Sequence, residues 1–199
     1  MIKAIISDLD GVIRSFPVSR NKEFEESYFL NPGELLSSVF FKVDLNHVVE
    51  GKIDDSEWRS RIANRIHRNY PDIDSVKLIN EWSNFPGTVN EEVLSLYKEV
   101  MEKRPFVLMT NGTDKVNSDL GLLGIKEEFD LIINSSELGF AKPDPKIFRY
   151  ALEKLQLNAQ EVAFIDDSAK NVEVANEQGF KCHQYQSFKE FKDFCINNL

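Results

Sequence analysis

Two aspartates near the start of the chain are the first residues that could do chemistry. Asp8 and Asp10 follow a short apolar run, Ala4-Ile5-Ile6, which predicts a buried strand that ends at a turn. Side chains alternate between the two faces of a strand, so both carboxylates would project the same way. Carboxylates held together repel each other unless a cation, a proton or hydrogen bonds compensate. The pair indicates a metal site or an acid/base pair, and the alternative from these residues alone is a plain Asp-Gly turn.

Polar residues also follow two later apolar runs, each predicted to be a strand. Such strands alternate with helices here, which implies a parallel sheet, and parallel strands end at one edge of a sheet. We therefore expect the polar groups to converge at that edge, together with the ammonium of Lys142, which lies on a loop before the next helix. The residues that follow the two runs are Thr110 and Asn111, and Asp166 and Asp167.

This set of carboxylates would be unfavourable without a compensating cation. A divalent cation that prefers oxygen ligands relieves the repulsion, and Mg²⁺ is the usual one where the substrate carries a phosphate. The sequence therefore predicts a magnesium site.

The order of elements predicts an α/β fold. From residue 86 onwards strands alternate with helices, which is typical of a doubly wound, Rossmann-like parallel sheet covered on both faces. Residues 21–82 instead show helical apolar spacing and few strand signals, and predict about four helices. We expect a core domain of residues 1–15 and 86–199, and a small all-helical cap domain of residues 16–85.

Local signals in the cap and its flanks give more detailed expectations. The helices of the cap are expected around Phe24, from Asn31, from residues 54–57 and from residues 74–75. Residues 12–17 look like a short connector. A capping box at residues 88–91 is expected to begin the first helix after the cap.

The sequence contains four short motifs that follow one another in a specific order along the chain. The chain resembles the haloacid dehalogenase-like superfamily, within it the phosphatase branch with a helical cap inserted after the first motif, and the likeness covers essentially the whole chain. Each motif alone is common, and the ordered set, each member at a strand or loop end, is specific. In order, the motifs are Asp8-Leu9-Asp10-Gly11-Val12, Thr110-Asn111-Gly112, Lys142 with Pro143, and Asp166-Asp167-Ser168 with Asn171.

The resemblance implies a role for each of these residues. Asp8 would be the nucleophile that forms an aspartyl-phosphate, and Asp10 the general acid and base. Thr110 and the Asn111 amide would bind phosphate oxygens, and Lys142 would offset the charge of Asp8 and the phosphate. Mg²⁺ would be held by the Asp8 carboxylate, the Asp10 carbonyl and Asp167, with Asp166 adjacent or acting through water. The dehalogenases of the family lack the second aspartate, so Asp10 favours phosphate chemistry.

Arg14 departs from the usual pattern after the first motif. Its position predicts a side chain near the mouth of the site, where it could meet an anionic or polyhydroxy part of the substrate. A solvated charge on a connector is the alternative interpretation.

Composition and net charge limit the kinds of partner that we expect the protein to bind. The 199 residues carry a net charge of −9, which disfavours nucleic acid, while a local cation still allows a small phosphorylated metabolite. No apolar run approaches the ~20 residues that span a bilayer, so we expect no membrane partner. Two cysteines without a motif favour a reducing, cytoplasmic setting. A monomer or a homodimer is expected.

These observations predict an Mg²⁺-dependent phosphohydrolase for small phosphate monoesters, such as a sugar phosphate or a nucleotide. One alternative is a phosphomutase resembling β-phosphoglucomutase, which shares the same core residues and differs in the phosphoryl acceptor. A signalling receiver that holds phosphate on aspartate is less consistent, because the middle strand here ends in Thr110. A catalytically silent binding protein is the third alternative.

Overall fold

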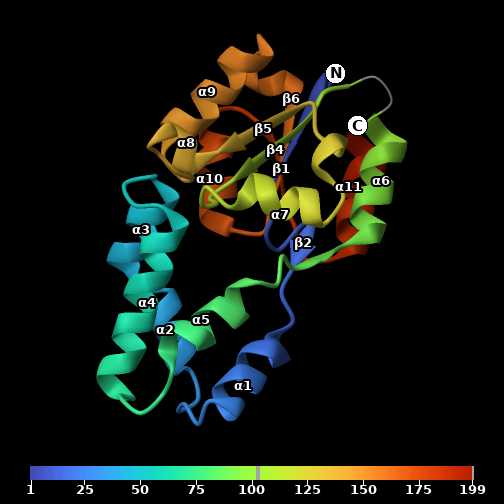
Figure 1. The fold of residues 1–199 in the computed structure, drawn as a ribbon. Coiled ribbons are helices and arrows are strands. Elements are labelled where there is room, and N and C mark those ends of the chain that lie inside the picture. The colour runs from blue at the N-terminus through green and yellow to red at the C-terminus, as the bar shows by residue number, and fades with distance from the viewer. Residues whose placement is uncertain (102–103, 199) are drawn as a thin grey trace.

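A parallel β-sheet lies at the centre of the larger of two lobes (Figure 1). The structure is a computed structural model that describes residues 1–101 and 104–198. Over these residues the sheet has five strands in the order β5-β4-β1-β6-β7, so the first strand of the chain is its middle one. This is the predicted doubly wound α/β fold. The strands are β1 Ala4–Ser7, β4 Phe106–Thr110, β5 Leu131–Asn134, β6 Val162–Asp166 and β7 Lys181–Gln184.

Helices cover both faces of this sheet. Side chains alternate along β1, so Ile5 packs with the helices of one face and Ile6 with those of the other. The central strands are therefore apolar up to their last residue, as a parallel sheet covered on both faces requires. One face is covered by α6 Glu91–Met101, α7 Val116–Leu122 and α11 Phe188–Asn198, and the other by α9 Pro145–Leu155 and α10 Ala169–Glu177; the short elements α8 Ser135–Leu138, η1 Lys126–Glu128 and η2 Ala159–Glu161 complete the lobe.

The second lobe, which we call the helical lobe, consists of residues 18–83 and lies between β2 and β3 in the sequence. Its helices pack around a separate apolar cluster that includes Leu35, Ile62 and Leu78. None of the helices described in either lobe is long and apolar enough to cross a membrane. Within the described residues the helices of this lobe are α1 Val18–Ser27, α2 Glu34–Val39, α3 Lys42–Val49, α4 Asp55–Asn69 and α5 Ser75–Ser83.

Helix α3 is the element that the predicted count of about four helices misses. Only Phe40 and the extended Phe41 separate α2 from α3, and neither Gly nor Pro marks the boundary. A turn this short leaves no sequence signal, because the two helices look like one continuing pattern. Asp44 of α3 accepts hydrogen bonds from Arg61 and Arg65 of α4, which fixes α3 against its neighbour.

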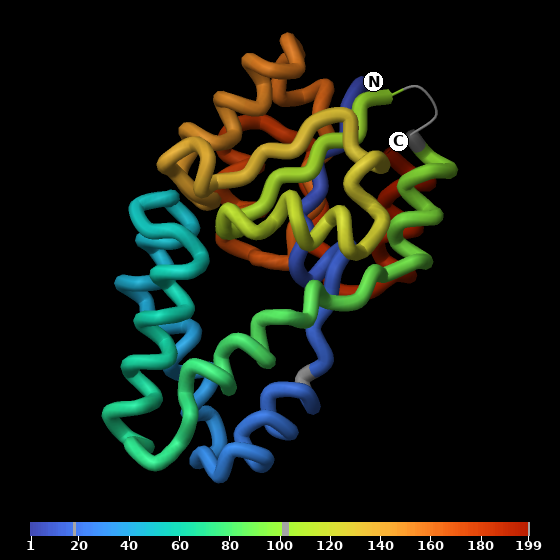
Figure 2. Tube along the Cα trace, viewed as in Figure 1, coloured from blue at the N-terminus to red at the C-terminus, as the bar shows by residue number. Residues whose placement is uncertain are grey.

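The two passages of chain between the lobes run side by side (Figure 2). Here β2, Arg14–Ser15, pairs antiparallel with β3, Thr88–Val89. Residues 12–17 connect the two lobes as predicted, although they include β2, whereas the capping box predicted at residues 88–91 is wrong because Thr88 lies in β3. The side chain of Asn90 caps α6 instead, accepting from the backbone N–H of Val93 at 3.3 Å. The two chain segments that join the lobes, with β2 and β3 paired between them, are called the neck below. The predicted domain boundaries at residues 16 and 85 lie beside it and stay a prediction.

The helical lobe also contacts the sheet lobe away from the neck. The hydroxyl of Ser135, in α8, donates to the backbone carbonyl of Val49 at 2.6 Å. At the start of α4, the N–H of Asp55 donates to the Asp114 carboxylate at 2.8 Å, and its own carboxylate accepts from Thr113 at 3.1 Å. The loop after β4 is thus in contact with both lobes.

Candidate active site

The register of the sheet brings the first and last predicted motifs together. Ser7 of β1 pairs with Leu108 of β4 and with Ile165 of β6, so the three strands end within two residues of one another. The next residues along β1 and β6 are Asp8 and Asp166. The N–H of Asp8 donates to the carbonyl of Ile165 at 2.8 Å, which holds Asp8 at the carboxyl edge of the sheet.

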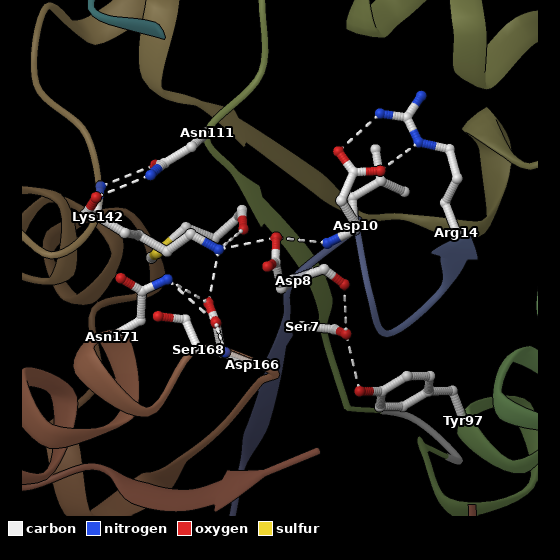
Figure 3. A network of polar contacts seen from close by, with 12 residues as sticks. Ser7, Asp8, Asp10, Arg14, Tyr97, Asn111, Lys142, Asp166, Ser168 and Asn171 are labelled. Atoms are coloured by element: carbon white, nitrogen blue, oxygen red, sulfur yellow. Dashed lines mark hydrogen bonds and ion pairs between the residues drawn. The ribbon is translucent and has the colours of Figure 1, made fainter. Parts of the chain in front are cut away.

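Lys142 lies between these two carboxylates (Figure 3). Its ammonium is 2.8 Å from Asp8 Oδ1 and 2.7 Å from Asp166 Oδ2, and it donates to the carbonyl of Met109 at 2.9 Å. The side chain of Asn111 accepts from the backbone N–H of Lys142 and donates to its carbonyl, both at 2.8 Å. All three donor positions of the ammonium are therefore used, and the loop that carries it is fixed.

Burial dominates the electrostatics of this group. It raises the pKa of Asp8 to about 7, with Lys142 opposing the shift and Asp166 adding to it. Burial alone would lower the pKa of Lys142, but the charges of Asp8 and Asp166 outweigh it and leave that pKa raised. The lysine therefore stays charged. A second cation near Asp8 would favour the ionised form of Asp8.

Asp166 has no exposed surface and is surrounded by donors. Besides Lys142, its carboxylate accepts from the N–H of Ser168 at 2.8 Å and from the side-chain amide of Asn171 at 3.0 and 3.1 Å. A buried carboxylate needs such hydrogen-bond partners to offset its loss of contact with water. Asp166 thus fixes Lys142 and the loop that leads to α10.

Asp167 completes an acidic group suited to a metal ion. One carboxylate oxygen from each of Asp8, Asp166 and Asp167 lies within 4.8 Å of the others, and Asp167 is the exposed member. Burial and the charge of Asp166 raise the pKa of Asp167. Three oxygen donors of this kind match the preference of Mg²⁺, which binds through one or two carboxylates and keeps the rest of its shell for water and phosphate.

Gly11 leaves the room that Asp167 occupies. Its φ is +87°, in the left-handed region, and a Cβ at this position would lie 2.3 Å from Asp167 Oδ2. Only glycine permits both the turn and this close approach. The first motif therefore determines where the last one can place its carboxylate.

Asp10 points away from Lys142, toward Arg14 (Figure 3). The guanidinium of Arg14 donates to both carboxylate oxygens of Asp10, from Nε at 2.6 Å and from Nη2 at 2.9 Å. It also donates to the carbonyl of Pro86 at 3.2 Å and to Asp119 at 3.3 Å. The predicted contact of Arg14 with a substrate stays a prediction, and its guanidinium already has three protein partners.

The residues predicted to bind phosphate lie at the same edge of the sheet. Thr110 is the last residue of β4 and is buried, and Asn111 follows it. The predicted nucleophile, phosphate-binding residues and metal ligands are thus brought together, while the role of each stays a prediction.

A cavity of about 320 Å³ opens above this edge, between the two lobes. That volume suits a small ligand. Asp10, Asn111 and Thr113 line it from the sheet lobe. From the helical lobe and the neck it is lined by aromatic and charged side chains, among them Arg20, Phe40, Trp58, Trp82 and Phe85.

Two supporting residues were not predicted from the sequence. Tyr97 of α6 donates to the hydroxyl of Ser7, which donates to the carbonyl of Asp8, both at 2.8 Å. Asp119 of α7 binds Arg14 and also pairs with Lys115 one turn earlier. The spacing of Lys115 and Asp119 on a helix is the one available signal for that pair, and it says nothing of Arg14.

Comparison with known proteins gives consistent results. A family model described as haloacid dehalogenase-like hydrolase matches residues 2–179. Bifunctional epoxide hydrolase 2 of Mus musculus is 24% identical over 86% of this chain, which spans only 34% of that protein's length. D-ribitol-5-phosphate phosphatase of Bacteroides thetaiotaomicron is 24% identical over 96% of both chains.

A solved structure matches along nearly the whole chain. It is a family enzyme of Bacteroides thetaiotaomicron in complex with magnesium and inorganic phosphate, with a TM-score of 0.74 and 25% identity over 94% of this chain and 95% of that one. The family model covers most of this chain, including all four motifs. The chain therefore belongs to the haloacid dehalogenase-like hydrolases.

Proposed function

We propose that this protein is an Mg²⁺-dependent phosphohydrolase that cleaves small phosphate monoesters through an aspartyl-phosphate on Asp8. The observation that carries the proposal is the buried Lys142 between Asp8 and Asp166, next to Asp167, while the neighbouring Asp10 and Asn111 line a cavity of about 320 Å³. Phosphoryl transfer depends mainly on positioning and charge neutralisation, and this arrangement supplies both. The phosphatase and the magnesium complex among the relatives support the same chemistry.

Asp8 would attack the phosphorus of the substrate. The new bond joins a carboxylate oxygen of Asp8 to phosphorus as the bond to the leaving oxygen breaks. Asp10 would give its proton to that oxygen, and then take a proton from the water that attacks the aspartyl-phosphate. Inorganic phosphate leaves, and both aspartates return to their starting forms.

The other residues would hold the phosphate and the charge. We assign phosphate oxygens to the Thr110 hydroxyl and to the backbone N–H of Asn111, because the side chain of Asn111 is already bound to Lys142. Lys142 remains charged throughout and offsets the negative charge around Asp8.

Asp8, Asp167 and the carbonyl of Asp10 would hold Mg²⁺. The carboxylate of Asp166 already accepts from three residues, so we assign it a contact through water. When bound, the ion supplies positive charge to the phosphate oxygens and fixes the substrate relative to Asp8.

The walls of the cavity bear on the choice between a nucleotide and a sugar phosphate. Trp58, Trp82 and Phe85 offer flat apolar surface, and Arg20 is held over the ring of Phe85. A nucleobase stacks on such ring faces, whereas the faces themselves offer no strong hydrogen bonds to the hydroxyl groups of a sugar. We therefore expect nucleoside monophosphates to be better substrates than sugar phosphates.

The test is phosphate release from a panel of nucleoside monophosphates and sugar phosphates, with Mg²⁺ and with a chelator. We expect release that needs Mg²⁺ and is essentially abolished in Asp8→Asn. Isomerisation of a sugar phosphate without net release would instead establish the mutase alternative. A folded, Mg²⁺-supplied protein that does neither would contradict the proposal.

A further inference from the structure

A tight turn fixes Asp10 and Arg14 relative to each other. The N–H groups of Ile13 and Arg14 both donate to the carbonyl of Leu9, at 2.9 and 2.7 Å, and the N–H of Gly11 donates back to the carbonyl of Arg14 at 2.8 Å. The positive φ of Gly11 permits this closed path. Both side chains therefore start from a rigid piece of backbone.

The guanidinium of Arg14 donates two parallel hydrogen bonds to the carboxylate of Asp10, an arrangement that we call the fork. Nε reaches Oδ1 at 2.6 Å and Nη2 reaches Oδ2 at 2.9 Å. A bidentate contact of this kind fixes the plane of the carboxylate as well as its position. Asp10 therefore has one orientation, where a free aspartate would have several.

Arg14 is itself held on its other edge. Nη1 donates to Asp119 at 3.3 Å and to the carbonyl of Pro86 at 3.2 Å, and the guanidinium lies 5.1 Å from the centre of the Phe16 ring. The residue is only 5% exposed, and Asp119 has a second partner in Lys115. The fork is thus supported by Asp119 of the sheet lobe and by residues of both chain segments that join the lobes.

The carboxylate of Asp10 remains available to a substrate. Its side chain is 46% exposed and lines the cavity between the lobes. A carboxylate oxygen has two lone pairs, so a hydrogen bond from Arg14 leaves one on each oxygen for a proton in transit. The fork orients Asp10 without occupying it.

We propose that Arg14 is a positioning residue, which holds the carboxylate of Asp10 toward the cavity so that it can exchange a proton with the leaving oxygen. The inference rests on the proposed function, because proton transfer by Asp10 matters only if the chain transfers a phosphoryl group. Misplacement of a catalytic group by about 1 Å can lower a rate about 100-fold. Loss of the contact that anchors the Asp10 carboxylate should therefore lower the reaction rate measurably.

The inference predicts a dependence on the leaving group. p-Nitrophenol departs without a proton, whereas ethanol needs one. In first-turnover experiments, Arg14→Ala should slow alcohol release from ethyl phosphate by about 10- to 100-fold, because a misplaced acid loses part of a contribution that is about 100-fold or more. Release of p-nitrophenol should slow by less than about threefold, because that step does not use the acid. Arg14→Lys should fall in between, since lysine cannot form the fork.

A double mutant separates positioning from direct substrate contact. If Arg14 acts through Asp10, Arg14→Ala combined with Asp10→Asn should be no slower than Asp10→Asn alone. A further loss in the double mutant, or a rise in KM that is the same for both substrates, would overturn the inference. Arg61→Ala is the matched control, because Arg61 pairs with Asp44 in the helical lobe and does not line the cavity.

A structural measurement completes the test. The crystal structures of Arg14→Ala and Arg14→Lys should show the Asp10 carboxylate in a new orientation or in several, and thermal unfolding should confirm that both variants are folded. An unchanged Asp10 would overturn the inference even if both substrates remain uncleaved. Wild-type protein that cleaves neither ester would contradict the proposed function instead.

Discussion

At the scale of single residues, one buried lysine binds two carboxylates of the acidic group. Lys142 satisfies Asp8 and Asp166 together, yet burial still raises the pKa of Asp8 to about 7. The metal-free site is thus short of positive charge. This is the condition under which a divalent cation binds carboxylates favourably.

The raised pKa of Asp8 predicts how stability depends on pH. Between pH 3.8, the ordinary pKa of an aspartate, and about pH 7, Asp8 keeps its proton in the folded protein but has lost it in the unfolded chain. The free energy of unfolding of the metal-free protein therefore falls as pH rises through this window. Asp8→Asn removes this titration. We expect the free energy of unfolding of the variant, relative to wild type, to rise across that window and level off above it. Urea denaturation in chelator at several pH values measures the difference, and a constant difference would contradict the shift.

Gly11 gives a second prediction at this scale. Gly11→Ala would place a Cβ 2.3 Å from Asp167 Oδ2, at a φ of +87° that also costs alanine about 1–2 kcal/mol. Asp167 must move, so Mg²⁺ should bind more weakly. Isothermal titration with Mg²⁺ measures this. Gly124→Ala is the control, because it has a similar positive φ and no atom near the new Cβ.

At the scale of elements, the contacts of the helical lobe with α8 and the loop after β4 set the shape of the cavity. Gly51, just after α3, lies against the backbone of α8, where a Cβ would be 2.0 Å from the carbonyl oxygen of Ser136. Ser135 donates to Val49 beside it. The end of α3 is therefore a docking point between the lobes.

Disturbing this docking point should affect substrate binding more than the fold. We expect Gly51→Ala to raise KM, because the lobe must shift away from α8 and so opens the cavity. Gly33→Ala is matched in backbone strain, with a φ of +86° and nothing near its Cβ, and should cost about 1–2 kcal/mol of stability without a change in KM. Steady-state kinetics and thermal unfolding separate the two effects. Equal KM values in the two variants would show that this contact does not shape the site.

At the scale of the whole molecule, metal binding and folding should be linked. The acidic group joins residues from the two ends of the sequence, Asp8 and Asp166-Asp167, so it exists only in the folded chain. A ligand that binds only the folded state stabilises it by about 2.7 kcal/mol at 100 times its Kd. We expect Mg²⁺ to raise the melting temperature of wild type and to have little effect on Asp167→Asn. An equal rise in both proteins would place the ion elsewhere.

Much of the fold could be predicted because its signals are local. Apolar runs predicted the three central strands of the sheet, and the loop of Lys142 was expected to lead into a helix, which the structure has as α9 with Asp144 as its cap. The convergence of Asp8, Lys142 and Asp166 followed from one further rule, that parallel strands end at one edge. Family resemblance then supplied the roles, which await experiment.

What could not be predicted depends on contacts between distant residues. Ser15 pairs with Thr88 in strands of two residues, too short for any periodic pattern. The fork of Arg14 on Asp10 is held by Asp119, more than a hundred residues away in sequence. A single sequence carries no mark of such pairs, because each residue on its own also suits a solvated position.

The central claim is that Asp8 carries the phosphoryl group, and trapping that intermediate tests it most directly. The protein would be mixed with Mg²⁺ and the best substrate of the panel, quenched in acid within the first turnovers, and digested for mass spectrometry. We predict one phosphoryl group on the peptide that contains Asp8, absent from Asp8→Asn and from samples with chelator. Phosphate release without any modification of Asp8, or with modification of another residue, would contradict the account.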